Sequence, residues 1–137
     1  MKITQTLLSL SLALLVFAAC ESTAQNISDE RVFKALDAES FAKKLHSTPD
    51  AQLVDLRTPG EVAQGTLKNC EVIDYTQPDF RENLKMLDKD KPVFIYCAVG
   101  GRSNQSMSIF HEMGFKEVYD LKGGIKAWAR LGYQIVR

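Results

Sequence analysis

The feature that most constrains the fold is an alternation of short apolar runs with segments of helical spacing. The runs are rich in β-branched and aromatic residues, and they cover Val32–Ala35, Ala51–Arg57, Glu71–Tyr75, Lys91–Cys97 and Lys116–Leu121. Each run is short enough to be a strand, and strands separated by helices are typical of parallel sheets. The sequence therefore predicts an α/β fold in which a mostly parallel sheet is flanked by helices on both faces.

The helices are predicted from caps, stops and apolar spacing. Asp37 offers an N-cap for a helix that carries Phe41 and Leu45. The other predicted helices cover residues 78–91, 102–115 and 123–133, and Gly114 is a stop signal for the second of these. With 137 residues in all, the chain has room for one domain.

The first residues have the pattern of an export signal. Lys2 precedes Leu7–Ala19, a 13-residue uncharged stretch that is too short to span a bilayer of roughly 30 Å. The stretch ends in "VFAAC", which resembles the lipobox of bacterial lipoproteins and implies lipid attachment at Cys20. We expect a signal peptide at 1–19, the lipid-bearing cysteine and a flexible tether at 20–30, and the domain at 31–137. Cleavage after Ala24 and a retained anchor are the alternatives.

The overall charge argues against a nucleic-acid partner. Lys and Arg together number 17, as do Asp and Glu, and removal of the signal leaves 16 basic against 17 acidic side chains. Such a balance predicts neither a nucleic-acid groove nor a polybasic membrane patch. Together with the export signal, this predicts a periplasmic or cell-surface protein that contacts the membrane only through its N-terminal lipid. We also expect a monomer.

The stretch "YCAVGGRS", residues 96–103, carries the strongest chemical signal. Cys97 ends the most apolar run and comes just before a predicted helix, so it falls at the carboxyl end of a strand, where ligands bind in open α/β sheets. The glycine pair lets several amide N–H groups converge on one point. Such surroundings lower the pKa of a thiol from about 8.5 to about 3.5–7.5, so Cys97 is a candidate nucleophile.

This stretch resembles the active-site loop of the rhodanese family, Cys-x-x-Gly-x-Arg-Ser. The matching residues are Cys97, Gly100, Arg102 and Ser103, with Ala98, Val99 and Gly101 in the open positions. "LVDLRTPGEVAQGTL" is similar to a second family stretch through Asp55, Arg57, Glu61 and Gly65. "GFKEVYDLKGGIKAWARLGY" is similar to the closing segment through Gly123, Gly124 and Trp128. The similarity covers roughly residues 32–137, the length of a whole single-domain member.

The resemblance implies a sulfurtransferase that works without a cofactor. Cys97 would take a sulfane sulfur from thiosulfate or a persulfide, small or protein-borne, and pass it to a thiophilic acceptor. The amides of residues 98–103 would cradle the outer sulfur, and Arg102 would attract an anionic donor or brace the loop. Asp55, Arg57 and Glu61 would support the site.

Two departures from the family pattern bear on the donor and on one motif. Thr66 stands where the family usually has histidine, and an aromatic residue is replaced by Val62. Because Ala98 and Val99 carry no charge, the loop favours a persulfide or a protein-borne donor over thiosulfate.

Three other functions are weighed against sulfur transfer. Phosphatases and arsenate reductases of the same fold use a longer Cys-x5-Arg loop, whereas four residues separate Cys97 from Arg102. A non-catalytic binding module with this fold, and a redox protein that pairs Cys97 with Cys70, are the others. Cys70 is also interpreted as a small buried hydrophobe. The only histidines, His46 and His111, are far apart in sequence, and no metal site is predicted.

Overall fold

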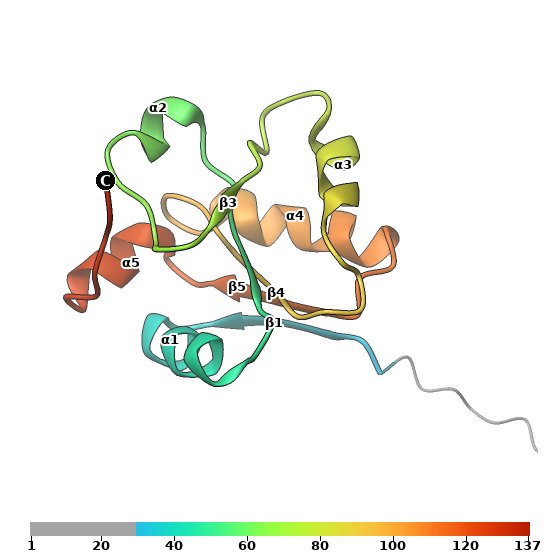
Figure 1. The fold of residues 1–137 in the computed structure, drawn as a ribbon, viewed down its shortest axis with the longest axis horizontal. Helices are drawn as coiled ribbons and strands as arrows, with labels where there is room; N and C mark the ends of the chain where they lie inside the picture. The colour runs from blue at the N-terminus through green and yellow to red at the C-terminus, as the bar shows by residue number, and fades with distance from the viewer. Residues whose placement is uncertain (1–29) are drawn as a thin grey trace, which may run out of the picture.

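Five parallel strands form one sheet in the computed structural model, which describes residues 30–137 (Figure 1). The strands are β1 (Val32–Leu36), β2 (Gln52–Asp55), β3 (Glu71–Val72), β4 (Val93–Tyr96) and β5 (Glu117–Leu121). Their order across the sheet is β1-β5-β4-β2-β3, and every pair is parallel. The predicted α/β class and the parallel sheet are confirmed.

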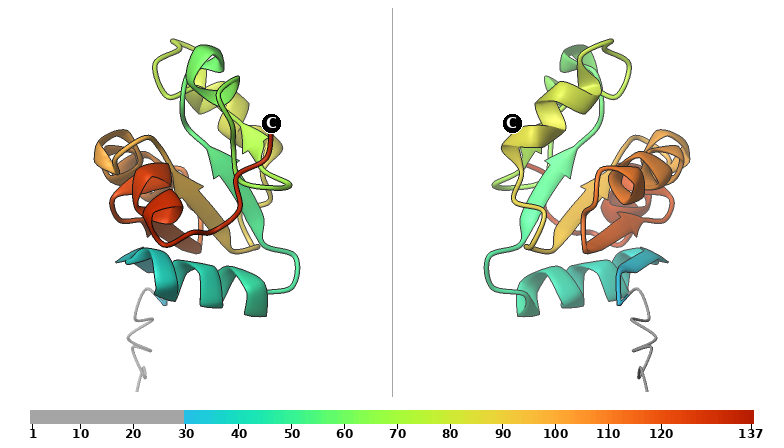
Figure 2. Two further views of the ribbon diagram at one scale, coloured as in Figure 1. Left: turned by 90° about the vertical axis from the view of Figure 1, so that its left-hand side faces the viewer. Right: turned by 90° about the vertical axis from the view of Figure 1, so that its right-hand side faces the viewer.

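Helices cover both faces of this sheet, as predicted. They are α1 (Ala38–Ser47), α2 (Pro59–Val62), α3 (Phe80–Asn83), α4 (Gly101–Glu112) and α5 (Gly124–Arg130), with a 3₁₀ turn at Leu84–Met86. Figure 2 shows α1 and α3 on opposite sides of the sheet. Asp37 caps α1 as expected, because its Oδ1 accepts a hydrogen bond of 2.8 Å from the amide of Ser40.

The central strand β4 divides the core into two parts. Val93 and Ile95 pack on the side of α3 and α4, while Phe94 and Tyr96 pack on the side of α1 and α5. All four side chains are fully buried. This explains why the strand is apolar at every position: a strand with helices on both faces has no side that faces water.

The predicted helix over residues 78–91 is wrong in its extent. One turn of α-helix and one 3₁₀ turn end at Met86, and Leu87 is extended with φ −81° and ψ 146°. Asp88 accounts for the early stop, because its side chain accepts a hydrogen bond from the amide of Asp90 and its own amide donates to Gln52 Oε1. A short polar side chain that bonds nearby backbone competes with the helix in this way.

The sheet order brings the carboxyl ends of β2, β4 and β5 together, since β4 pairs with both of the others. The segments that leave these three strands therefore share one edge of the molecule. The signal peptide, Cys20 and the tether lie outside the described residues. Among residues 30–137 no helix is long and apolar enough to cross a membrane.

Candidate active site

Cys97 directly follows β4 and lies under the loop that leads into α4. Its side chain is 1% exposed, and its Sγ accepts hydrogen bonds from the amide of Gly100 at 3.1 Å and from the hydroxyl of Ser103 at 3.5 Å. Gly100 adopts φ +93°, and a Cβ there would stand 3.0 Å from the amide nitrogen of Gly123. The backbone conformation favours glycine at this position, and a side chain there would also be crowded.

The loop lowers the pKa of the Cys97 thiol. Burial of the sulfur acts in the opposite direction, because it disfavours the charged thiolate. The hydroxyl of Ser103 and the amides of Ser103, Val99 and Gly100 outweigh burial, since they bond the thiolate better than the thiol. The sulfur is thus held in a ring of donors suited to a negative charge.

Arg102 lies at the first turn of α4 and makes a two-point ion pair with Glu61. Its Nη1 and Nη2 donate to the two carboxylate oxygens at 2.8 and 2.6 Å. The hydrogen bonds from Arg102 lower the pKa of Glu61 to about 2. The same carboxylate accepts bonds from the amide and hydroxyl of Thr58 at 3.1 and 2.9 Å, which fix it at the start of α2. Arg102 therefore braces the loop against α2.

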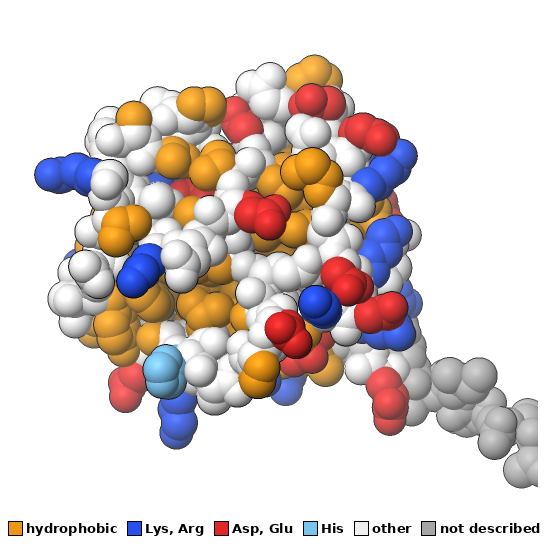
Figure 3. Space-filling model, in the orientation of Figure 1, with side chains coloured by type: hydrophobic (Ala, Val, Ile, Leu, Met, Phe, Trp, Pro, Cys, Tyr) orange, Lys and Arg blue, Asp and Glu red, His pale blue; other side chains and the backbone are white. Residues whose placement is uncertain are grey.

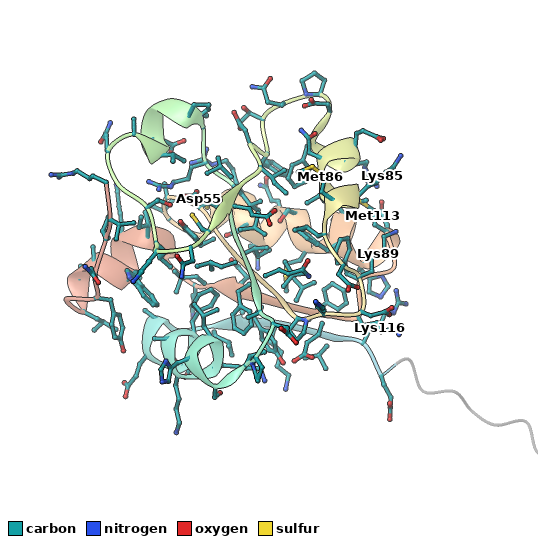
Figure 4. The ribbon with its side chains drawn as sticks, in the orientation of Figure 1. Asp55, Lys85, Met86, Lys89, Met113 and Lys116 are labelled. Carbon is teal, nitrogen blue, oxygen red and sulfur yellow. The ribbon has the colours of Figure 1, made fainter. Side chains whose placement is uncertain are left out.

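Asp55 and Arg57 form a second ion pair at the end of β2, and both are buried. Arg57 Nη2 donates to Asp55 at 2.6 Å and to the carbonyl oxygen of Gly65 at 2.7 Å, so the pair also holds the segment after α2. Figure 4 labels Asp55 at the α2 end of the sheet. Neither side chain bonds Cys97, so the pair supports the framework around the loop.

Thr66, at the position where the family usually has histidine, belongs to a polar cluster beneath that pair. Its Oγ1 donates to Asp55 Oδ2 at 2.9 Å and lies 2.6 Å from the Tyr96 hydroxyl and 2.9 Å from Cys70 Sγ. Burial raises the pKa of Tyr96, so its hydroxyl stays neutral. A small hydroxyl thus joins three side chains on the α1 and α5 side of the sheet.

The two described cysteines do not form a disulfide. Both are free thiols, and Cys97 packs in the core on the α4 side whereas Cys70 packs against the core on the α5 side. The sheet stands between the two cores. A direct Cys70–Cys97 pairing would require the sheet to open.

Helix α5 is tied to the loop through its backbone. The amides of Ile125 and Lys126 donate to the carbonyl oxygens of Cys97 and Ala98 at 2.9 and 3.2 Å. A Cβ on Gly124 would stand 2.4 Å from the Cys97 oxygen, so a glycine is needed for this approach. The glycines of the predicted closing segment are therefore part of the site's scaffold.

The structure brings most of the predicted site residues to one edge, with different roles. Gly100, Ser103 and Val99 contribute donors to Cys97, Arg102 pairs with Glu61, and Gly101 begins α4 in open space. Val99 carries a side chain that is 57% exposed at the surface of the loop.

Sequence reasoning missed Asp120, whose carboxyl is buried beside Ser103 and Asn104. Its Oδ1 has no hydrogen-bond partner, and burial raises its pKa. The only signal in the sequence is an acidic residue inside the apolar run 117–121. Within residues 30–137, no three His, Cys, Asp or Glu side chains gather in a way that would hold a metal ion.

A cysteine under an amide-rich loop at the end of a parallel strand is an arrangement that can hold an anionic group on or beside the sulfur, and sequence comparison identifies the family to which the chain belongs. Residues 37–131 match the family model described as "Rhodanese-like domain". This chain is 40% identical over 101 residues to a sulfurtransferase of Allochromatium vinosum, which covers 74% of this chain and 92% of that protein. It is 30% identical over 95 residues to a putative sulfurtransferase of Bacillus subtilis, YtwF, covering 69% of this chain and 89% of that protein.

Solved structures agree with these sequence matches. A rhodanese-related protein from Thermoplasma volcanium superimposes with a TM-score of 0.67 at 27% identity, covering 76% of this chain and 98% of that one. A rhodanese-like domain protein from Staphylococcus aureus gives 0.65 at 28% identity, covering 77% and 100%. The chain belongs to the rhodanese-like domain family, whose relatives include proteins named sulfurtransferases.

Proposed function

We propose that this protein is a sulfurtransferase that carries a sulfane sulfur on Cys97. The observation that supports it is the ring of donors around Cys97 Sγ, which lowers the pKa of the thiol in a buried position. A thiolate is the nucleophilic form of cysteine, and backbone amides that favour its charge favour a terminal persulfide anion equally.

The reaction has two displacement steps. The Cys97 thiolate attacks the outer sulfur of the donor, and the donor's sulfur–sulfur bond breaks with its electron pair leaving on the inner sulfur. That leaving group is a thiolate when the donor is a persulfide and sulfite when it is thiosulfate. An acceptor nucleophile then attacks the outer sulfur of the Cys97 persulfide and expels the Cys97 thiolate.

A persulfide is the proposed donor. Arg102 is the only cation of the loop 97–103, and its charge is matched by the two carboxylate oxygens of Glu61. The loop thus offers no unpaired cation to a small dianion such as thiosulfate. The exposed Val99 beside the cysteine is better suited to the carbon skeleton of an organic persulfide.

The test is to expose the purified protein separately to thiosulfate and to glutathione persulfide. Intact mass should show one added sulfur, and cyanolysis should release it as thiocyanate, with glutathione persulfide the more efficient donor. Cys97→Ser should remove the added sulfur, whereas Cys70→Ser, the matched control thiol, should keep it. Absence of any Cys97-dependent persulfide with both donors would instead support a non-catalytic binding module.

We also propose that the domain works at a membrane surface of an exported compartment. The support is the lipobox-like "VFAAC" before Cys20 and the polar tether that follows. Expression with a radiolabelled fatty acid should label the protein, and Cys20→Ala should abolish the label. Labelling that survives this substitution would contradict lipid attachment at Cys20, and recovery of a chain that starts at Gln25 would show cleavage after Ala24 instead.

A further inference from the structure

The C-terminal segment of the domain is strongly positive, although the protein as a whole is neutral. From Leu121 to Arg137 the sequence contains four cations and no aspartate or glutamate. These cations are Lys122, Lys126, Arg130 and Arg137, and all four are exposed. A local excess of one sign beside a site attracts ligands of the other sign.

Some cations elsewhere on the surface are paired with acidic side chains. On the α3 side, Lys85 pairs with Glu82 and Lys116 with Asp90, each at 2.5 Å. Figure 4 labels both lysines on that side, and acidic and basic side chains alternate there in Figure 3. Lys126 and Arg130 form no ion pair with any residue between 30 and 137, and the same holds for Lys43 and Lys91, so what distinguishes the first two is their position.

These two cations line an open hollow of the surface, called the cavity below, against the loop that follows Cys97. Its volume is about 470 Å³, and its walls are Val99, Gly123, Lys126, Ala129 and Arg130. Lys126 and Arg130 are one helical turn apart on α5 and so share a face. Arg130 folds back along the helix, because its Nη2 lies 3.9 Å from the place a Cβ of Gly123 would take.

The cavity is held at a fixed position relative to Cys97. The amide of Lys126 bonds the carbonyl oxygen of Ala98, the residue after the nucleophile, and the amide of Ile125 bonds that of Cys97. Val99, which forms the apolar wall, also offers its amide to Cys97 Sγ. A ligand in this cavity therefore lies against the same loop that carries the reacting sulfur.

We propose that this cavity binds the carboxylates of an acidic, low-molecular-weight thiol whose persulfide is the sulfur donor. The proposal rests on the proposed sulfurtransferase function. It adds that the protein recognises the donor by the donor's carboxylates. Lys126 and Arg130 meet the carboxylates, while Val99 and Ala129 contact the carbon skeleton. The volume of about 470 Å³ is in the range of about 300–1,000 Å³ that is usual for sites of organic ligands, so the cavity has room for such a molecule.

The first experiment measures binding without chemistry. S-methylglutathione, which carries two carboxylates and cannot transfer sulfur, is titrated into the Cys97→Ser protein and followed by NMR or calorimetry. The double variant Lys126→Gln/Arg130→Gln should weaken its binding about tenfold, as expected for loss of two exposed charge contacts. The matched control is Lys43→Gln/Lys91→Gln, which removes the same charge from exposed lysines outside the cavity lining and should leave binding unchanged. Equal weakening in both double variants would overturn the subsite.

The second experiment separates the subsite from the proposed function. With glutathione persulfide as donor, the Lys126/Arg130 double variant should raise KM about tenfold and change kcat less than twofold. With the persulfide of 2-mercaptoethanol, which has no carboxylate, KM should not change. Sulfur transfer that is unaffected with both donors would overturn the subsite and leave the sulfurtransferase intact. Charge-dependent binding of S-methylglutathione without transfer from any donor would support the subsite and contradict the function.

One further outcome concerns a protein-borne donor. If S-methylglutathione does not bind, and transfer from an acidic peptide persulfide nevertheless depends on Lys126 and Arg130, the occupant is a segment of a partner protein. That result would overturn the assignment to a low-molecular-weight thiol.

Discussion

Asp120→Asn is expected to make the protein more stable at neutral pH, although it removes a native charge. Asp120 is buried on β5, and its Oδ1 has no hydrogen-bond partner; hydrogen bonds from the side chains of Ser103 and Asn104 to the carboxylate offset only part of the cost of burial, since the pKa of Asp120 is still raised. A buried polar group left unsatisfied costs about 1–3 kcal/mol, and more when it is charged. Asparagine has the same shape without the charge, so we expect the free energy of unfolding at pH 7 to rise by about 1–2 kcal/mol. For a domain of this size that corresponds to a rise in Tm of roughly 4–10 °C.

The pH dependence of this effect gives the sharper test. Burial raises the pKa of Asp120 above its ordinary value of 3.8, so the folded protein holds this proton more tightly than the unfolded chain does. The protonated Asp120 side chain therefore makes its full contribution to the free energy of unfolding below pH 3.8. That contribution is lost as the pH rises through the pKa of Asp120 in the folded protein. The advantage of Asp120→Asn should be near zero below pH 3.8 and reach its full value above the folded pKa.

Urea unfolding of the two proteins from pH 3 to pH 8 measures the difference directly. Asp50→Asn is the control, because it removes the same charge from an exposed position and should give a difference close to zero throughout. A gain for Asp120→Asn that does not vary with pH would show that the charge is not its cause. A loss of stability at pH 7 would show that the hydrogen bonds from Ser103 and Asn104 to the carboxylate outweigh the cost of its burial, and it would refute the reasoning.

Three further substitutions test the loop and its supports. Ser103→Ala removes one donor from Cys97 Sγ and should raise the thiol pKa by up to about one unit, seen as a shift of the iodoacetamide alkylation profile to higher pH. Gly124→Ala places a Cβ 2.4 Å from the Cys97 oxygen at φ +60° and should cost at least about 3 kcal/mol, whereas Gly132→Ala, at φ +78° in open space, should cost only about 1–2 kcal/mol; urea unfolding compares them. Glu61→Gln should cost about 1–2 kcal/mol at pH 7, after allowance for a side chain that is 33% exposed. The pKa of Glu61 is lowered from 4.5 to about 2, so this cost should disappear between pH 4.5 and 2 in unfolding curves, and a cost that persists at pH 2 would contradict the ion pair.

The strands and the loop of residues 97–103 could be predicted because their signals are local. In β4 the apolar residues are continuous in sequence, which indicates a buried strand. The glycines after Cys97 indicate that the chain turns there. The predicted helix over residues 78–91 was too long, because the spacing of apolar residues does not indicate where a helix ends. Phe80, Leu84 and Leu87 are all buried as their spacing suggested, yet Leu87 reaches the core from an extended backbone.

The pairings within the site could not be predicted because they depend on strand order. Glu61 follows β2 and Arg102 follows β4, 41 residues later, and they meet because β2 and β4 are neighbours in the sheet. The sequence indicates that both strands exist but does not order them. Thr66 is a similar case, since its contacts with Asp55, Tyr96 and Cys70 join three separate segments of the chain.

The Glu61–Arg102 pair also explains why we expect the cations that attract an anionic donor to lie outside the loop of residues 97–103. An unpaired arginine next to Cys97 would stabilise the thiolate and a donor anion alike, but it would leave a flexible, glycine-rich loop without its tie to α2. Once Glu61 holds Arg102, the loop is tied to α2 and the charge of Arg102 is balanced by a carboxylate. Burial, the Ser103 hydroxyl and backbone amides are then the largest influences on the pKa of Cys97, while Arg102 also interacts with its sulfur. Attraction of the donor then requires cations that are near the loop but outside its structural pairs. Lys126 and Arg130 meet both conditions, because α5 is bonded to the loop through its backbone while their side chains remain unpaired among residues 30–137.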